Sequence, residues 1–167
     1  FEPDPSQGSN IAWSPNGDLI AFFARSGKKH DLFLVSPLSG KIVTKIKIQA
    51  DQPSSPCFIP GEDALIFTAF DGIRHDLFRL DLKTEKVQNL TQDDLYEKAP
   101  AVSPDGRFIV YSIRLNGYDQ IYLSPLHNLS KKTQLTFGTS DSISPVFSPD
   151  GKKVYYSDNK REAYNLY

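Results

Sequence analysis

The sequence predicts an all-β protein, a β-propeller made of four repeats of a four-stranded antiparallel blade. Prolines in four turn motifs recur at intervals of 45, 44 and 45 residues, at Pro15, Pro60, Pro104 and Pro149. Aromatic residues keep this spacing in two further sets, at Phe22, Phe67, Tyr111 and Tyr156 and at Phe33, Phe78, Tyr122 and Tyr167. A period of about 40–45 residues filled with short apolar runs is typical of propeller blades, whereas helical repeats show a 3.6-residue periodicity.

Each repeat opens with a short first strand and a turn. We expect the first strands at residues 11–14, 56–59, 100–103 and 145–148. The turn reads Ser-Pro-Asn-Gly at 14–17 and Ser-Pro-Asp-Gly at 103–106 and 148–151. Proline presets φ, Asn or Asp hydrogen-bonds the local backbone, and glycine accepts a positive φ, so this tetrapeptide predicts a hairpin. The second repeat ends its turn with Gly61 and Glu62, which predicts a different turn geometry there.

The second strands are apolar on both faces. Phe67 alternates with Ile66, and Tyr111 alternates with Val110. This pattern predicts a strand buried on both sides, as in a blade packed between two others. Third strands follow from Asp31, Asp76, Gln120 and Asn165, and fourth strands are expected at 42–48, 86–91 and 133–136. No helix is predicted.

The repeats divide the chain, a single propeller segment over 1–167, at approximately 11–55, 56–99, 100–144 and 145–167. In this register the chain begins where the last strand of an earlier blade would finish, and it ends inside a third strand. The last repeat is therefore incomplete, and we expect a partial propeller. A four-bladed ring closed by the N-terminal segment is the alternative.

Composition narrows the function classes. The 19 basic and 20 acidic residues leave a net charge of -1, which gives no long-range attraction to nucleic acid. No apolar run approaches the roughly 20 residues of a spanning helix, so no membrane insertion is expected. Cys57 is the only cysteine, which excludes an internal disulfide and a cysteine-cluster zinc site.

Residues 148–157 read Ser-Pro-Asp-Gly-Lys-Lys-Val-Tyr-Tyr-Ser and are followed by Asn165-Leu166-Tyr167. Together they resemble the WD40-like repeat of the TolB-like β-propeller family. Residues 103–107, 120–122 and 135–136 match the same pattern. The resemblance implies a protein-binding module of the bacterial envelope. Similar repeats form the propeller of prolyl-oligopeptidase-like and tricorn-like serine peptidases, whose catalytic domain would lie outside this chain.

The residues that could take part in catalysis or bind a metal are better explained by structural roles. His30-Asp31 and His75-Asp76 recur one repeat apart, but Gln120 occupies the same position in the third repeat, so we expect hydrogen bonding to the preceding loop. Cys57 aligns with small apolar residues, which predicts a buried, inert thiol. No serine elbow, phosphate loop or His-Glu-x-x-His motif is present. We therefore predict no catalytic residues, no metal and no cofactor.

The expected binding residues lie in loops. The connections between blades and those from second to third strands emerge on one face of a meandering blade. The first set of connections would display Asp51, Asp93, Asp94, Glu97 and Asp141, and the second set Arg25, Arg74, Arg114 and Arg161. From these we select as candidate binding residues Asp51, Asp94, Asp141, Arg25, Arg74 and Arg114. A mixed-charge rim of this kind suits recognition of a protein or peptide.

These observations predict a non-catalytic protein-interaction scaffold of TolB-like type. We expect a monomer or part of a larger chain, in a periplasmic or secreted setting. The first alternative is the gating propeller of a serine peptidase of the prolyl-oligopeptidase-like or tricorn-like kind. A propeller that binds a carbohydrate or another small ligand in its channel is the second.

Overall fold

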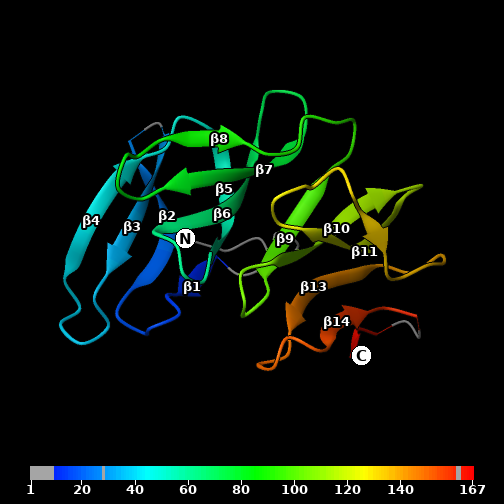
Figure 1. Cartoon of the computed structure of the whole chain (residues 1–167). Helices are drawn as coiled ribbons and strands as arrows, with labels where there is room; N and C mark the ends of the chain where they lie inside the picture. Colours follow the sequence, from blue (N-terminus) through cyan, green and yellow to red (C-terminus); the bar gives the residue numbers. More distant parts are fainter. Residues whose placement is uncertain (1–9, 28, 161–162) are drawn as a thin grey trace.

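The computed structural model describes residues 10–27, 29–160 and 163–167, and the regular elements in this part are all β-strands (Figure 1). Blade 1 contains β1 (Ile11–Trp13), β2 (Ile20–Ser26), β3 (Lys29–Val35) and β4 (Ile42–Lys47). Blade 2 contains β5 (Asp51–Phe58), β6 (Ala64–Phe70), β7 (His75–Asp81) and β8 (Val87–Asn89). Blade 3 contains β9 (Glu97–Val102), β10 (Phe108–Leu115), β11 (Tyr118–Pro125) and β12 (Thr133–Gln134). Blade 4 contains β13 (Ser142–Phe147), β14 (Val154–Asp158) and β15 (Asn165–Leu166).

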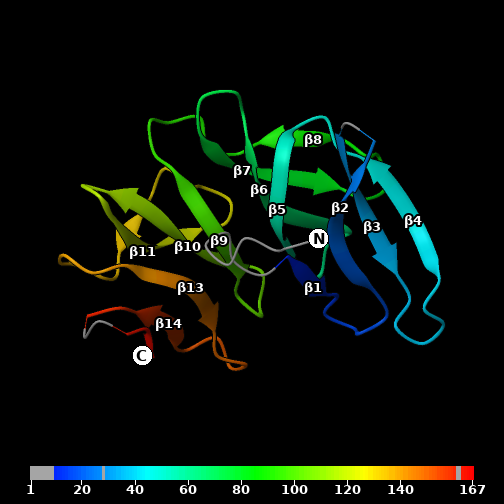
Figure 2. The ribbon, with the colours of Figure 1, turned by 180° about the vertical axis from the view of Figure 1, so that it is seen from behind.

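Each blade is an antiparallel meander in which strands adjacent in sequence pair with one another. Blades 1 to 3 have four strands, and blade 4 has three in the described part of the chain. The first strands β1, β5, β9 and β13 contact one another in turn, so they line a common axis while the later strands lie outside (Figures 1 and 2). The predicted all-β propeller of successive antiparallel blades is confirmed.

The second strands β6 and β10 are buried on both faces because neighbouring blades cover both. The same prediction is wrong for β2 and β14, which are only partly buried: Phe22 is intermediate and Tyr155 is 38% exposed. In β6 the ring of Phe67 lies 5.2 Å from the ring of Phe23 of blade 1. The adjacent Ile66 points the other way and packs in the cluster that contains Tyr111 of blade 3. Successive strand residues point to opposite faces, so a strand between two blades needs an unbroken apolar run, as predicted.

Three first strands begin earlier than the sequence pattern predicted. The structure starts β5, β9 and β13 at Asp51, Glu97 and Ser142. The residues before Pro56, Pro100 and Pro145 have positive φ angles, of 51°, 48° and 53° at Ser55, Ala99 and Ser144. The strand register shifts there. A bulge lets a strand continue past a residue that cannot donate to the ladder. The proposed repeat boundaries at 56, 100 and 145 follow the sequence register and fall inside these strands.

The turn between first and second strands has the predicted chemistry in three blades. Gly17, Gly106 and Gly151 have φ angles of 77°, 71° and 70°. Each donates its amide to the carbonyl of the turn's serine at 2.8 or 2.9 Å. In blade 2 the positive φ of 81° is at Gly61, and Glu62 donates its amide to the carbonyl of Ile59 at 3.2 Å. The left-handed residue thus sits one position earlier, which confirms the different geometry predicted there.

Candidate functional site

The six candidate binding residues lie on one face, called the charged face below. It is formed by the ends of the second strands and by the connections between blades. Four of the residues are exposed and two are partly buried; the exposed ones are Arg25, Asp51, Asp94 and Arg114, and the partly buried ones are Arg74 and Asp141. Asp51 is the first residue of β5 and does not belong to a connection, because the bulge lengthens that strand. Arg161 lies outside the described residues.

Arg74 and Asp94 form an ion pair between the β6–β7 connection and the connection that leads to β9. The Asp94 side chain is 101% exposed and that of Arg74 is 23% exposed. Asp71 shapes the first connection, because its carboxylate accepts hydrogen bonds from the amides of Ile73 and Arg74, both at 2.8 Å. Exposed ion pairs contribute at most about 1 kcal/mol, so this pair displays charge without contributing much to stability.

Arg114 pairs with Asp119. Its Nη1 lies 3.5 Å from Asp119 Oδ2, and its Nη2 donates to the carbonyl of Gly117 at 2.7 Å. Asp141 accepts a hydrogen bond from the amide of Asp119 at 2.9 Å, and its own amide donates to Asn159 Oδ1 at 2.8 Å. Asp141 therefore ties β11 of blade 3 to the end of β14 in blade 4, in addition to any role on the surface.

Glu97 was expected on the charged face, but it is 0% exposed. Its cross-strand partner is Ile113, which packs between blades 2 and 3, so Glu97 faces this interface. Lys132 Nζ lies 3.9 Å from Glu97 Oε1 and pairs with Asp93. Neither carboxylate oxygen of Glu97 has a hydrogen-bond partner among the described residues. Burial, and next the nearby charge of Asp93, raise the pKa of Glu97 to about 8.

His75 and Asp76 do not act as a pair, because adjacent strand residues point to opposite faces. The His75 ring packs 4.8 Å from the ring of Tyr96. Asp76 Oδ2 accepts a hydrogen bond from Asn89 Nδ2 at 2.6 Å. In blade 3 the equivalent Gln120 donates to the carbonyl of Ser140 at 2.8 Å. The partners come from the outer strand or the connection after it, so the expected bonding to the preceding loop is wrong at these two positions.

The thiol of Cys57 accepts a hydrogen bond from the amide of Val102 in β9 at 3.2 Å. Burial raises its pKa to about 11, which disfavours the reactive thiolate.

Among the residues that the structure describes, no three His, Cys, Asp or Glu side chains form a group that could hold a metal ion. The same part of the chain contains no helix long and apolar enough to cross a membrane.

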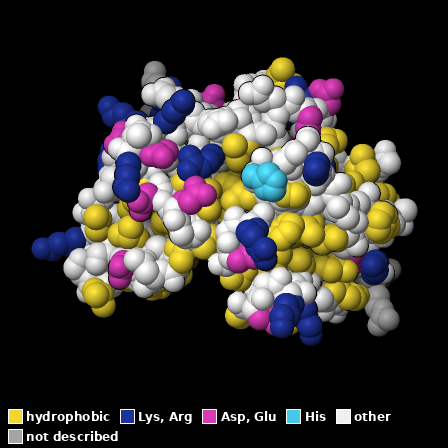
Figure 3. Space-filling model, viewed as in Figure 1, with side chains coloured by type: hydrophobic (Ala, Val, Ile, Leu, Met, Phe, Trp, Pro, Cys, Tyr) yellow, Lys and Arg dark blue, Asp and Glu magenta, His cyan; other side chains and the backbone are white. Residues whose placement is uncertain are grey.

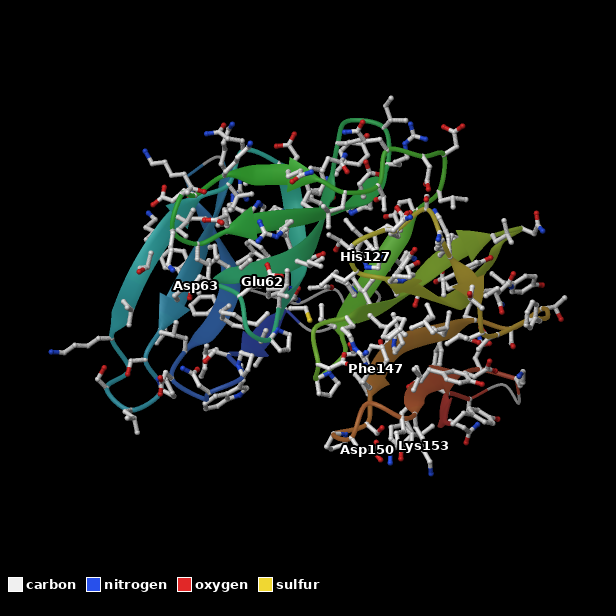
Figure 4. The ribbon with its side chains drawn as sticks, in the orientation of Figure 1. Glu62, Asp63, His127, Phe147, Asp150 and Lys153 are labelled. Carbon is white, nitrogen blue, oxygen red and sulfur yellow. The ribbon has the colours of Figure 1, made fainter. Side chains whose placement is uncertain are left out.

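A pocket of about 500 Å³ lies between blades 2 and 3 on the face opposite the charged face. Glu62 and Arg79 of blade 2 line it, together with Arg107, Phe108 and His127 of blade 3. Figure 3 shows hydrophobic side chains gathered around a histidine there, and Figure 4 labels it as His127. Periodicity could not reveal this pocket, because it is formed where the repeats differ from one another.

Comparison with known proteins identifies the family. The family model for the TolB beta propeller domain matches residues 43–167. The structure of TolB from Acinetobacter baumannii is similar, with 25% identity and a TM-score of 0.75 over 95% of this chain and 39% of that one. A putative TolB from Agrobacterium tumefaciens has 21% identity and a TM-score of 0.77, over 93% of this chain and 56% of that one.

Similar folds occur in other settings. A structure from a study of prolyl endopeptidases has 15% identity and a TM-score of 0.64, over 95% of this chain and 26% of that one. A nidogen/laminin complex has 15% identity and a TM-score of 0.67, over 89% of this chain and 56% of that one. A search of curated proteins gives no match. The chain thus spans only part of these proteins. Because the family model covers well over half of the chain, this protein belongs to the TolB beta propeller domain family.

Proposed function

We propose that the chain is a non-catalytic interaction scaffold whose charged face binds a protein or peptide partner. The observation that carries this proposal is the set of exposed acidic and basic side chains at the ends of strands in successive blades. The side chain of Asp94 is 101% exposed. Charges of both signs on one face set the orientation of a partner and the rate of its association. Membership of the TolB beta propeller domain family supports this function.

The candidate residues divide into two roles. Arg25, Asp51, Asp94 and Arg114 are exposed and are the proposed partner contacts. Arg74 and Asp141 are partly buried, so we assign them mainly to positioning. Similarity to two bacterial TolB structures supports a periplasmic or secreted setting and a partner from the bacterial envelope.

Site-specific photocrosslinking would test the scaffold. A photoreactive amino acid at Asp94 would be compared with one at Lys41, an exposed position between β3 and β4 on the opposite face. In a bacterial envelope extract we expect discrete protein adducts from position 94 alone. Reversal of two other exposed contacts, Arg25 to glutamate and Asp51 to lysine, in the protein that carries the photoreactive residue at position 94 should abolish these adducts and leave the far-ultraviolet circular dichroism spectrum unchanged. Identical adducts from both positions, or adducts that survive reversal, would contradict the proposal.

The second candidate is the substrate-access propeller of a serine peptidase. The similarity to the prolyl endopeptidase structure favours it. Under either function the purified chain should not hydrolyse peptide or ester substrates. Peptidase activity in a longer form of the protein, coupled to a loss of size selectivity when blades are disrupted, would favour this second candidate over the scaffold.

A further inference from the structure

The pocket between blades 2 and 3 has an apolar floor and a polar rim. Ile59 and Ile66 form part of the floor and are 2% and 0% exposed. Leu90 and Leu126 complete it, and Phe108 lies at the side with 38% of its surface exposed. A cavity of about 500 Å³ with few polar groups around an apolar interior has the dimensions of a small-ligand site.

The walls of the pocket include segments in which blades 2 and 3 differ from the other repeats. Blade 2 has Gly61 and Glu62 where the other turns end in Asn or Asp and then glycine. The connection between β11 and β12 covers residues 126–132 and is longer than its equivalents at 36–41 and 82–86. His127 belongs to that longer connection. Figure 4 places Glu62 on blade 2 and His127 on blade 3, on either side of the pocket.

The rim offers hydrogen-bond donors. Glu62 Oε2 already accepts a hydrogen bond from Arg79 Nη2 at 2.8 Å, so this carboxylate is paired within blade 2. Arg107 uses its Nε to bond Asp105 Oδ2 at 2.6 Å, and its guanidinium lies 5.9 Å from the centre of the Phe108 ring. Within the described residues, the two Nη groups of Arg107 and the ring nitrogens of His127 have no hydrogen-bond partner. Donors of charge-assisted bonds therefore stand directly beside an apolar wall.

The corresponding pocket between blades 1 and 2 has different chemistry. Its volume is about 310 Å³, and its ionisable lining residues are Glu62 and Asp63, with no Lys, Arg or His. The two pockets are formed at equivalent turns, so this contrast comes from the different side chains and from the longer connection between β11 and β12. Asp63 pairs with Lys83 and Glu62 with Arg79, so the pocket between blades 1 and 2 offers an anion no free cationic group among the described residues of its lining, whereas Arg107 offers one between blades 2 and 3.

From this geometry we infer that the pocket between blades 2 and 3 is a binding site for an apolar carboxylate. The apolar body lies on the floor against Phe108, and the carboxylate accepts hydrogen bonds from Arg107 and His127. The ligand is either a free aromatic or aliphatic acid or the C-terminal residue of a peptide. This site lies on the face opposite the proposed scaffold surface and stands independently of it.

Two matched pairs of probes test the site. They are 3-phenylpropionate with its amide, and an acetylated tripeptide ending in phenylalanine as the free acid and as the amide. Binding to the purified protein is followed by amide chemical shifts in NMR titrations. We expect saturable shifts at Gly106, Phe108 and His127, with the carboxylates binding about five- to tenfold more tightly than the amides because they form charge-assisted bonds. Tighter binding of the tripeptide than of the free acid would identify a peptide as the source.

Arg107→Gln should weaken binding of the carboxylates about five- to tenfold and leave the amides unchanged. Lys152→Gln is the matched control, because Lys152 occupies the same turn position in blade 4 and lies away from the pocket. An unchanged melting temperature checks that both variants fold. Equal affinity for acids and amides, no effect of Arg107→Gln, or no binding at about 10 mM ligand, the weak end of specific recognition, would overturn the proposal.

Discussion

The interface between blades 1 and 2 and the interface between blades 2 and 3 use the same repeat positions but different chemistry. Phe67 fills the first and packs 5.2 Å from Phe23. The equivalent residue in the second is Tyr111, whose hydroxyl lies 3.0 Å from Ser124 Oγ. Glu97 faces the second interface, and Pro53 takes its place in blade 2.

This difference shows how a repeat protein can use one interface between blades mainly for packing and the next for polar and ionisable groups. The buried cluster of the first interface is apolar and includes Phe67 and Phe78, but the buried carboxyl group of Asp76 lies on the same face of β7 as Phe78 and bonds Asn89. Beside the second lie a buried carboxylate, the thiol of Cys57 and the larger of the two pockets. Glu97, Cys57 and the larger pocket therefore lie between blades 2 and 3, whereas the buried Asp76 and the smaller pocket lie between blades 1 and 2. The following predictions test that contrast.

The largest effect is expected from truncation in the apolar interface. Phe67→Ala should lower the free energy of unfolding by about 3–5 kcal/mol, because it removes a fully buried ring and leaves a cavity. Tyr111→Phe should lower it by only about 1 kcal/mol, since the ring stays and one hydrogen bond is lost. Urea unfolding measures both variants. Equal losses would mean that the hydroxyl of Tyr111 is as important as the packing of Phe67.

The next effect concerns the pH dependence that Glu97 confers. Its pKa is raised from 4.5 to about 8 in the folded protein, so the folded state keeps a proton that the unfolded state has lost. The free energy of unfolding should therefore fall as pH rises from about 5 to 8, by about 2 kcal/mol or more, and then become level. Glu97→Gln should remove most of this slope and make the protein more stable at pH 8.

Urea unfolding at several pH values checks this prediction. Asp94→Asn is the control, because the exposed Asp94 should leave the slope unchanged. A slope that is the same in Glu97→Gln and in the natural protein would show that Glu97 is already ionised in the fold.

Two turn glycines should respond differently to alanine. Both have a left-handed φ, so each substitution should cost about 1 kcal/mol of backbone strain. At Gly106 the added Cβ would also lie 2.9 Å from the carbonyl oxygen of Pro60 in blade 2, whereas at Gly151 it would lie 3.5 Å from Pro104 Cδ. Gly106→Ala should therefore destabilise more than Gly151→Ala in thermal unfolding. A larger destabilisation by Gly151→Ala than by Gly106→Ala would show that the contact between Gly106 and Pro60 is not the closer of the two.

The smallest effect on stability should come from the charged face. Asp94→Lys replaces a fully exposed carboxylate and breaks only its surface pair with Arg74. The free energy of unfolding should change by less than about 1 kcal/mol. Urea unfolding of Asp94→Lys and of Glu97→Gln under the same conditions compares the two changes in the free energy of unfolding. A change as large as that in Glu97→Gln would show that Asp94 helps to hold the fold.

The blade architecture was predictable because it repeats. Each position occurs four times, so an ambiguous residue in one repeat is resolved by its equivalents in the others. The recurring turn prolines, turn glycines and aromatic residues therefore identify the strands and their order. The starts of β5, β9 and β13 were less predictable. Proline usually ends a ladder, and only the bulges at Ser55, Ala99 and Ser144 allow these strands to continue.

The candidate site was predictable in part. Topology places Arg25, Asp51, Arg74, Asp94, Arg114 and Asp141 on one face. The sequence could not tell which charges remain exposed, because this depends on neighbours far along the chain. Asp141 bonds the amide of Asp119 in another blade, and Glu97 is covered by blade 2.

The sequence by itself determined the repeat, the all-β class, the turn chemistry and the sidedness of the loops, since all of these depend on residues within one blade. Only the tertiary structure decided which carboxylates are buried, which arginines are paired and where the larger pocket lies. Those properties arise where two blades meet. They depend on distances between residues such as Glu62 and His127, which local sequence does not encode.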